Sequence, residues 1–133
     1  MELILLDTCT FLWLADSKKS LPPAVKDALR ASGERYVSAI SAFEIGYKNA
    51  QGKLDLPSAP AVWFQDSCAA RGIRTLPISD AIAMRASQLP MHHRDPADRF
   101  IIATALEYDA RVLTPDPYFL PYGVKLLWDG LPQ

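Results

Sequence analysis

The sequence predicts an α/β fold: a three-layer α/β/α sandwich in which helices cover both faces of a mostly parallel central sheet. Short apolar runs alternate along the chain with helical stretches, and this alternation is typical of right-handed β–α–β crossovers. Acidic residues follow several of the apolar runs. The carboxyl ends of parallel strands share one edge of a sheet, so we expect these acids to gather there.

Composition favours a single compact domain over residues 1–133. Half of the residues are hydrophobic and the formal net charge is −1, which excludes a disordered chain. No apolar stretch approaches the roughly 20 residues that span a bilayer, and the opening MELILLD carries an acid where a signal peptide carries positive charge. We therefore expect a cytoplasmic protein without a membrane partner. Cys9 and Cys68 match neither a disulfide framework nor a zinc site, and are expected to be buried free thiols.

The first third of the chain predicts two strands separated by two helices. Residues 2–6 form a continuous apolar run, as in a buried parallel strand. Residues 8–15 are apolar most of the way round and predict a short helix. A pair of prolines opens a second helix within residues 20–31, and the run 36–40 predicts the second strand.

The middle third predicts three helices and one strand. Helices are expected over residues 41–51 and 60–71, because a glycine follows each stretch, and residues 53–57 connect them. The run 73–78 predicts the third strand. A serine at position 79 is a suitable N-cap for a helix that ends at residue 89.

The last third predicts one helix and two strands. Residues 90–94 form a polar loop, and Asp-Pro opens a helix over residues 95–108. Residues 111–114 predict the fourth strand, residues 115–121 a loop rich in turns, and residues 124–128 a final edge strand.

Five acidic residues form the candidate site. Asp7 ends the first strand and Glu44 follows the second. Asp95 and Asp98 lie at the start of the helix after the polar loop, and Asp116 follows the fourth strand. Converging carboxylates repel one another and raise their own pKa values unless a cation lies between them. Clustered oxygen ligands suit Mg²⁺ or Mn²⁺. The pattern therefore predicts a metal-dependent enzyme that acts on phosphate esters.

Each acid also has an explanation as a helix cap or a turn residue. Asp7 and Asp95 precede helices, and Asp116 lies between two prolines. Ser41 and Glu44 have the spacing of a capping box, in which the Glu44 side chain would bond back to the Ser41 backbone. The two roles are compatible, because a cap fixes the rotamer of the acid and the helix dipole keeps it ionised.

Basic residues near these acids are few, and the overall charge is not that of a typical nucleic-acid-binding domain. The nearest candidates for contacts with a polyanion are Lys48, Arg94 and Arg99, of which the two arginines could instead pair with the acids. His92 and His93 are interpreted as loop residues, because adjacent residues rarely point the same way and no zinc spacing is present. Metal binding or acid–base chemistry is their alternative role.

The segments MELILLDTCTFLWL, SAISAFEIGYKNAQGKLDLP, HHRDPADRFIIATAL and LTPDPYF resemble the PIN-domain ribonucleases, and among them the VapC-like toxins of bacterial toxin–antitoxin pairs. The resemblance extends over nearly the whole chain and is most specific in HHRDPADRFIIATA. It implies a PIN-like fold, one or two Mg²⁺ or Mn²⁺ ions, and RNA as the substrate. It also implies a cognate antitoxin as a protein partner and a homodimer.

The residues that match the family's metal-binding and catalytic carboxylates are Asp7, Glu44, Asp98 and Asp116. Asp95 stays outside this quartet. Two positions depart from the family pattern, namely Ala97, which is often a bulky aromatic, and Pro115. The implied reaction is hydrolysis, in which a bound cation lowers the pKa of a water and orients it toward a phosphodiester. Thr8 and Thr114 would support the acids by hydrogen bonds.

Two other interpretations stay open. In a phosphatase or response-regulator-like fold, Asp7 would be a covalent nucleophile. The sequence offers neither a second acid beside it nor a lysine between Lys53 and Lys125, both usual in those families. In a non-catalytic PIN-like binding module, the acids would only cap helices, because fold alone does not assign function. Binding of a divalent cation distinguishes the enzyme from the module.

Overall fold

The computed structural model describes residues 2–16 and 19–132. Within these ranges, five strands form one sheet with the order β3-β2-β1-β4-β5, and every neighbouring pair is parallel. The strands are β1 (Ile4–Leu6), β2 (Arg35–Ser38), β3 (Ile73–Leu76), β4 (Arg111–Leu113) and β5 (Lys125–Leu127). The predicted parallel α/β sheet is therefore confirmed, with strands a residue or two shorter at their ends.

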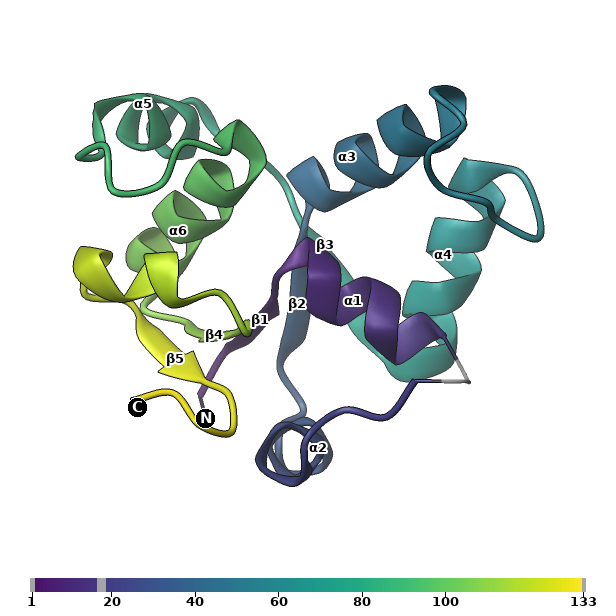
Figure 1. Cartoon of the computed structure of the whole chain (residues 1–133), viewed down its shortest axis with the longest axis horizontal. Helices are drawn as coiled ribbons and strands as arrows, with labels where there is room; N and C mark the ends of the chain where they lie inside the picture. The colour runs from purple at the N-terminus through teal and green to yellow at the C-terminus, as the bar shows by residue number, and fades with distance from the viewer. Residues whose placement is uncertain (1, 17–18, 133) are drawn as a thin grey trace.

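Helices cover both faces of this sheet (Figure 1). They are α1 (Thr8–Ala15), α2 (Pro23–Ala31), α3 (Ala39–Ala50), α4 (Pro60–Arg71), α5 (Asp80–Gln88), α6 (Pro96–Tyr108) and the 3₁₀ helix η1 (Pro117–Tyr122). Figure 1 shows α5, α6 and η1 on one side of the strands, α1, α3 and α4 on the other, and α2 below them. Residues of α2 pack in the same cluster as those of α1 and α4. No helix in the described part of the chain is long and apolar enough to cross a membrane.

The alternation of side chains along β1 explains the two cores. Ile4 and Leu6 point to one face and pack in a cluster with Phe11, while Leu5 points to the other face and packs with Ile102 and Phe119. Successive residues of a strand face opposite sides of the sheet, so a continuous apolar run requires cover on both faces. The run that begins the sequence therefore fixes the three-layer arrangement.

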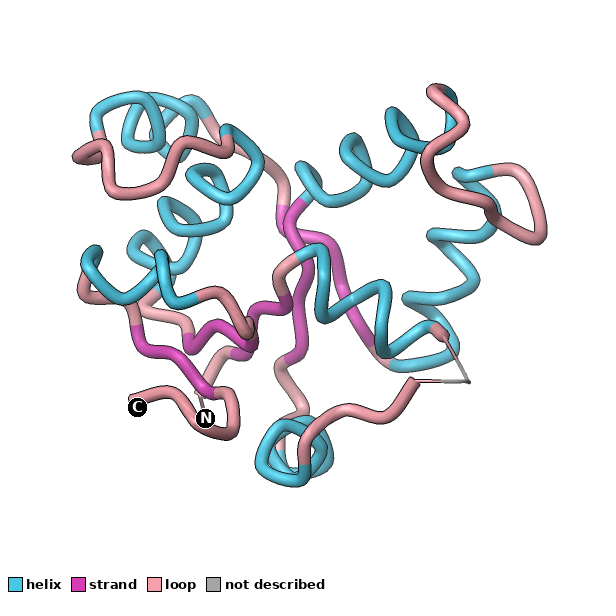
Figure 2. Tube along the Cα trace, in the orientation of Figure 1, coloured by secondary structure: helices cyan, strands magenta, loops and turns pink. Residues whose placement is uncertain are grey.

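The strand order places a switch point beside β1. The chain crosses from β1 to its neighbour β2 and on to β3, and then returns to pair β4 with the opposite edge of β1. In such sheets the crevice beyond the carboxyl ends at the switch point is the usual ligand site. Asp7 directly follows β1 and Thr114 directly follows β4. Figure 2 shows the strands together in the middle of the molecule, with helices around them.

The start of α3 differs from the prediction. β2 ends at Ser38, and the Ser38 side chain caps the helix by accepting the Ile40 backbone N–H at 3.1 Å. The helix therefore begins at Ala39 rather than at residue 41. Ser41 is buried within its first turn, where its hydroxyl bonds to that of Thr8 at 2.7 Å. The predicted capping box of Ser41 and Glu44 is wrong, because an earlier serine provides the cap.

Two further predictions need correction. The loop expected at residues 115–121 contains η1, which Asp116 caps through the Tyr118 backbone N–H. Both cysteines are free as expected, but only Cys68 is buried, and Cys9 is exposed. In contrast, Ser79 caps α5 as predicted, by accepting the Ile82 N–H at 3.1 Å.

Candidate metal centre

The four predicted acids line one cavity at the carboxyl edge of the sheet. Its volume is about 390 Å³. The charged residues that line it are Asp7, Glu44, Lys48, Asp95, Asp98 and Asp116. They come from the ends of β1 and β4, from α3, and from the start of α6. The parallel sheet thus brings together acids that are distant in sequence. Asp7 and Asp116, for example, are 109 positions apart (116 − 7).

Asp7 is the most deeply buried of these acids, with 4% of its surface exposed. It is the N-cap of α1, and its Oδ1 accepts the Thr10 backbone N–H at 2.8 Å. Its Oδ2 accepts the Thr114 hydroxyl at 2.5 Å. Burial raises the pKa of Asp7, while the hydrogen bonds from Thr10 and Thr114 oppose this effect. The carboxylate is therefore held in one orientation at a cost that a nearby cation would offset.

Asp98 lies in the first turn of α6, and its pKa is raised to about 7. Burial is the largest cause, and the negative charge of Asp95 is the next. His93 opposes the shift, whereas Asp7 and Glu44 increase it. The carboxylates of three different elements therefore act on Asp98, and their mutual repulsion is the electrostatic signature expected of a cation site.

Glu44 provides an independent observation. Its Oε2 lies 3.3 Å from the Lys48 Nζ, one turn further along α3. Its Oε1 is buried and has no hydrogen-bond partner among the described residues. A buried carboxylate oxygen without a partner is costly. Hard divalent cations such as Mg²⁺ and Mn²⁺ bind carboxylate oxygens, so the donor atoms at this edge fit such an ion.

Asp95 and Asp116 both cap helices. The Asp95 side chain accepts the Ala97 backbone N–H at 2.9 Å at the start of α6. Asp116 accepts the Tyr118 N–H at 2.9 Å through Oδ1. Asp95 therefore caps α6 as predicted. It also lines the cavity, so its negative charge still acts on the site.

His93 lies at the site, although the sequence analysis favoured a loop residue there and kept metal binding or acid–base chemistry only as its alternative role. Its Nε2 lies 2.8 Å from Asp116 Oδ2 and 3.1 Å from Asp98 Oδ2. Among the described residues, His93, Asp98 and Asp116 form a group whose possible ligand atoms all lie within 4.8 Å of one another. Asp7 and Glu44 line the acidic cavity together with Asp98 and Asp116, but they lie outside this tighter group. The only sequence signal was the position of His93 two residues before the helix cap Asp95.

The predicted supporting residues divide into two sets. Thr114 bonds to Asp7 as expected, whereas Thr8 bonds to Ser41 and not to an acid. Arg99 is buried and donates to backbone carbonyls, so the prediction that it contacts the acids or a phosphate is wrong. Lys48 lines the acidic cavity. Arg94 is exposed and lines a neighbouring cavity.

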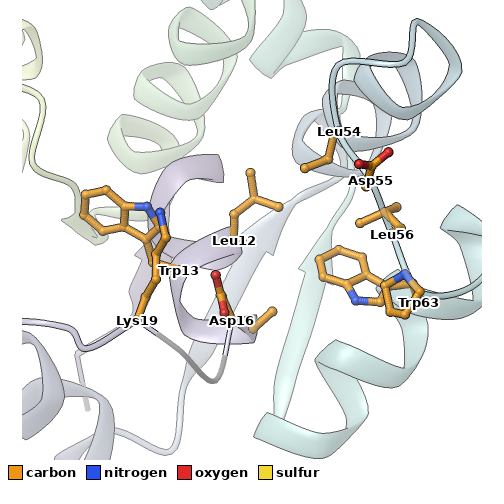
Figure 3. A pocket seen from close by; sticks show the side chains of 10 residues that line it. Leu12, Trp13, Asp16, Lys19, Leu54, Asp55, Leu56 and Trp63 are labelled. Atoms are coloured by element: carbon orange, nitrogen blue, oxygen red, sulfur yellow. The ribbon is translucent and has the colours of Figure 1, made fainter.

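A second cavity adjoins the acidic cavity. It has a volume of about 470 Å³ and shares Leu12 and Trp13 of α1 with the acidic cavity. Figure 3 shows Leu12, Leu54 and Trp63 around this second cavity, contributed by α1, the connector after α3, and α4. Its charged lining residues are Asp16, Lys19 and Asp55, and the amine of Lys19 lies 5.6 Å from the centre of the Trp13 ring. The second cavity therefore has both apolar and charged walls.

Known proteins resemble this chain over most of its length. The PIN domain profile matches residues 4–124. Ribonuclease VapC22 of Mycobacterium tuberculosis is 34% identical over 117 residues, which cover 87% of this chain and 88% of that protein.

Solved structures share the fold at lower identity. DNA-bound VapBC from Salmonella typhimurium has a TM-score of 0.70 at 19% identity, covering 96% of this chain and 98% of that chain. FitAcB from Neisseria gonorrhoeae has a TM-score of 0.65 at 22% identity, covering 94% and 96%. A toxin–antitoxin complex from Klebsiella pneumoniae has a TM-score of 0.56 at 21% identity, covering 85% and 86%. These likenesses concern the fold and agree with the predicted α/β/α sandwich.

Proposed function

This chain belongs to the PIN-domain family, and from that premise we propose that it is a metal-dependent endoribonuclease, the toxin of a toxin–antitoxin pair. The observation that carries the proposal is the acidic cavity, where a buried Glu44 oxygen lacks a partner and the pKa of Asp98 is raised to about 7. A similar protein, 34% identical, is named a ribonuclease.

The residues proposed to hold the cation are Asp7, Glu44, Asp98 and Asp116. When bound there, Mg²⁺ or Mn²⁺ supplies a Lewis acid that lowers the pKa of a water and offsets charge on phosphate oxygens. The protein's contribution is to fix the carboxylates beforehand. Asp7 and Asp116 each accept a backbone N–H through one oxygen and a side-chain hydrogen bond through the other, so little reorganisation is needed on binding.

Lys48 is the residue proposed to meet the RNA backbone. Its ammonium lies at the cavity beside Glu44, where a phosphate oxygen can replace the carboxylate as its partner. A contact of this kind positions a polyanion without reading its sequence. The overall charge of −1 means that such local cations carry the attraction.

The aspartyl-nucleophile alternative is not favoured by the sequence around Asp7. Families with a covalent aspartyl nucleophile usually also have a second acid beside it and a lysine late in the chain. This chain has no acid directly beside Asp7 and no lysine between Lys53 and Lys125. The non-catalytic module differs from the enzyme in one measurable respect, since helix caps alone require no cation.

An antitoxin is the proposed protein partner. The solved relatives include a toxin–antitoxin complex, and the second cavity, with Leu54 and Trp63 in its wall, adjoins the acidic cavity of this chain. An inhibitor that inserts an arginine among the carboxylates would form charge-assisted bidentate bonds and exclude the cation.

The test is RNA cleavage by wild-type protein and by Asp7→Asn and Asp98→Asn variants, in Mn²⁺, in Mg²⁺ and in EDTA. We expect wild-type cleavage only with a cation, and a loss of at least about a hundredfold in both variants, because each loses an anionic oxygen ligand. Asp95→Asn is expected to lose less, since its main role is the cap of α6.

Asp80→Asn is the matched control, because Asp80 is an exposed acid at the start of a helix remote from the cavity. Variants should first be checked for folding by circular dichroism. Folded wild-type protein that cleaves equally well in EDTA, or that cleaves no RNA under any condition, would contradict the proposal. Equal losses in Asp95→Asn and Asp98→Asn would show that the quartet is wrongly chosen.

A further inference from the structure

His93 joins two segments of the site that are distant in sequence. Asp98 belongs to the first turn of α6, whereas Asp116 follows β4 and caps η1. The His93 Nε2 contacts the Oδ2 atoms of both, at 3.1 Å and 2.8 Å. Only 11% of the His93 side chain is exposed. One imidazole nitrogen is therefore shared by two carboxylates of the proposed metal quartet.

The surroundings of His93 fix the orientation of its ring. The ring packs edge-on against Phe119, with 5.7 Å between ring centres. The His93 backbone N–H donates to the Tyr122 hydroxyl at 2.7 Å, and the His93 carbonyl accepts from Arg99 at 3.2 Å. These contacts tie both the backbone and the side chain of this loop residue to η1 and α6, so the position of Nε2 is determined by packing.

The second ring nitrogen indicates where the proton lies. The Asp95 backbone N–H donates to His93 Nδ1 at 3.2 Å. This bond matches the tautomer in which Nδ1 offers its lone pair and Nε2 carries the proton. In that tautomer Nε2–H donates to carboxylates and has no lone pair for a metal ion.

His93 also lines a neighbouring cavity. This cavity has a volume of about 330 Å³ and is lined by His92, Arg94 and Tyr118 as well, whereas the lining of the acidic cavity does not include His93. Asp95 lines both cavities. The imidazole therefore lies at the border of the acidic cavity, in contact with two of its carboxylates.

We propose that His93 is a positioning residue, whose Nε2–H fastens Asp98 of α6 to Asp116 of the turn after β4 and so sets the spacing of two carboxylates that hold the cation. This inference rests on the proposed function, because it concerns the same metal site. In this proposal the cation is held by carboxylate oxygens alone, which suits Mg²⁺ and Mn²⁺. His93 positions those carboxylates and is not itself a ligand.

The test compares His93→Gln with His93→Leu, with His92→Leu as the matched control. A glutamine amide can place an N–H near the position of Nε2, whereas leucine fills the space without a donor. His92 is the exposed neighbour, and its ring contacts Tyr122. Mn²⁺ affinity is measured by titration calorimetry. We expect a loss of about tenfold or more in His93→Leu, but changes within about threefold in His93→Gln and His92→Leu.

A second readout needs no metal. Long-range ¹H–¹⁵N NMR spectra of the metal-free wild-type protein identify which ring nitrogen carries the proton, and we expect a proton on Nε2. A ring without a proton on Nε2 would overturn the proposal, even if the leucine variant does not fold. Spin-echo spectra of bound Mn²⁺ that show directly coordinated ¹⁴N, lost in His93→Gln, would also overturn it.

The outcomes separate this inference from the function on which it rests. Wild-type protein that binds Mn²⁺, with an equal affinity in His93→Leu, would overturn the positioning role alone. Wild-type protein that has the expected Nε2–H but binds no Mn²⁺ would overturn the metal site, and the positioning role with it.

Discussion

Three acids at the carboxyl edge each hold the first turn of a helix. Asp7, Asp95 and Asp116 accept backbone N–H groups of α1, α6 and η1. Capping contributes about 1 kcal/mol per site, and the positive end of the helix dipole favours the ionised acid. At the scale of single residues, helix capping therefore holds these carboxylates close together although their charges repel one another.

The raised pKa of Asp98 predicts how metal-free stability depends on pH. In the unfolded chain an aspartate has a pKa of about 3.9, whereas in the folded protein the pKa of Asp98 is about 7. Between these values the folded state binds the proton more tightly than the unfolded state. The contribution of Asp98 to stability is therefore fully present below the unfolded pKa of about 3.9, falls between the two pKa values, and is lost once the pH has risen through about 7.

Urea unfolding of metal-free wild type and Asp98→Asn measures this effect. We expect the variant to gain stability relative to wild type as the pH is raised from about 5 to about 7.5, because it lacks the buried charge. The same comparison with Asp80→Asn should show no such trend. A stability difference between wild type and Asp98→Asn that is independent of pH would contradict the raised pKa.

Local sequence patterns predicted the acids of the site, but they did not predict the contacts of His93 and Arg99. Asp7 and Asp98 were predicted because strand ends and helix starts are local features. His93 was interpreted as a loop residue, since its contact with Asp116 crosses 23 positions and depends on how η1 packs. Arg99 was wrongly assigned to the acids for the same reason, because its partners are backbone carbonyls of another helix and loop.

At the scale of elements, Arg99 connects α6 to the end of α5 and to the loop that carries His93. Its guanidinium donates to four backbone carbonyls. They belong to Ala86, Leu89, Pro90 and His93, at 2.7–3.2 Å. Arginine suits this role because its planar fork offers several donors in fixed directions. The loop before α6 is therefore held by a buried cation rather than by secondary structure.

Replacement of Arg99 by methionine is expected to lower the free energy of unfolding by about 2–4 kcal/mol, because buried carbonyls lose a charged donor. Arg94→Met is the control, since Arg94 is exposed on the same loop and should change stability by less than about 0.5 kcal/mol. Urea unfolding of the two variants provides the measurement. Equal stability of Arg99→Met and wild type would show that these bonds add nothing net.

The ends of helices were predicted correctly where a single residue caps or terminates the helix. Gly72 ends α4 with a left-handed φ of 63°, and Ser79 caps α5. The start of α3 was predicted at Ser41, but Ser38 provides the cap. The Ser41 hydroxyl bonds instead to that of Thr8, a contact that depends on the packing of α1 beside α3 and that local pattern could not predict.

For the whole molecule, the order of strands explains the site. The apolar runs and their crossovers predict a parallel sheet covered on both faces, but they do not state which strands are neighbours. The position of β1 between β2 and β4 brings Asp7 beside Thr114 and Asp116. The sequence analysis predicted that the acids converge because the fold class places strand ends at one edge. The strand order explains which of these ends lie side by side.

The central claim is that these carboxylates share a divalent cation, and thermal unfolding tests it most directly. Wild type, Asp98→Asn and Asp80→Asn are unfolded in EDTA and in Mn²⁺ at about 100 times its dissociation constant. A ligand of the folded state at that concentration stabilises it by about 2.7 kcal/mol, or about 10 °C for a domain of this size. We predict this shift in wild type and Asp80→Asn and its loss in Asp98→Asn. An unchanged wild-type midpoint with saturating Mn²⁺ would contradict the account.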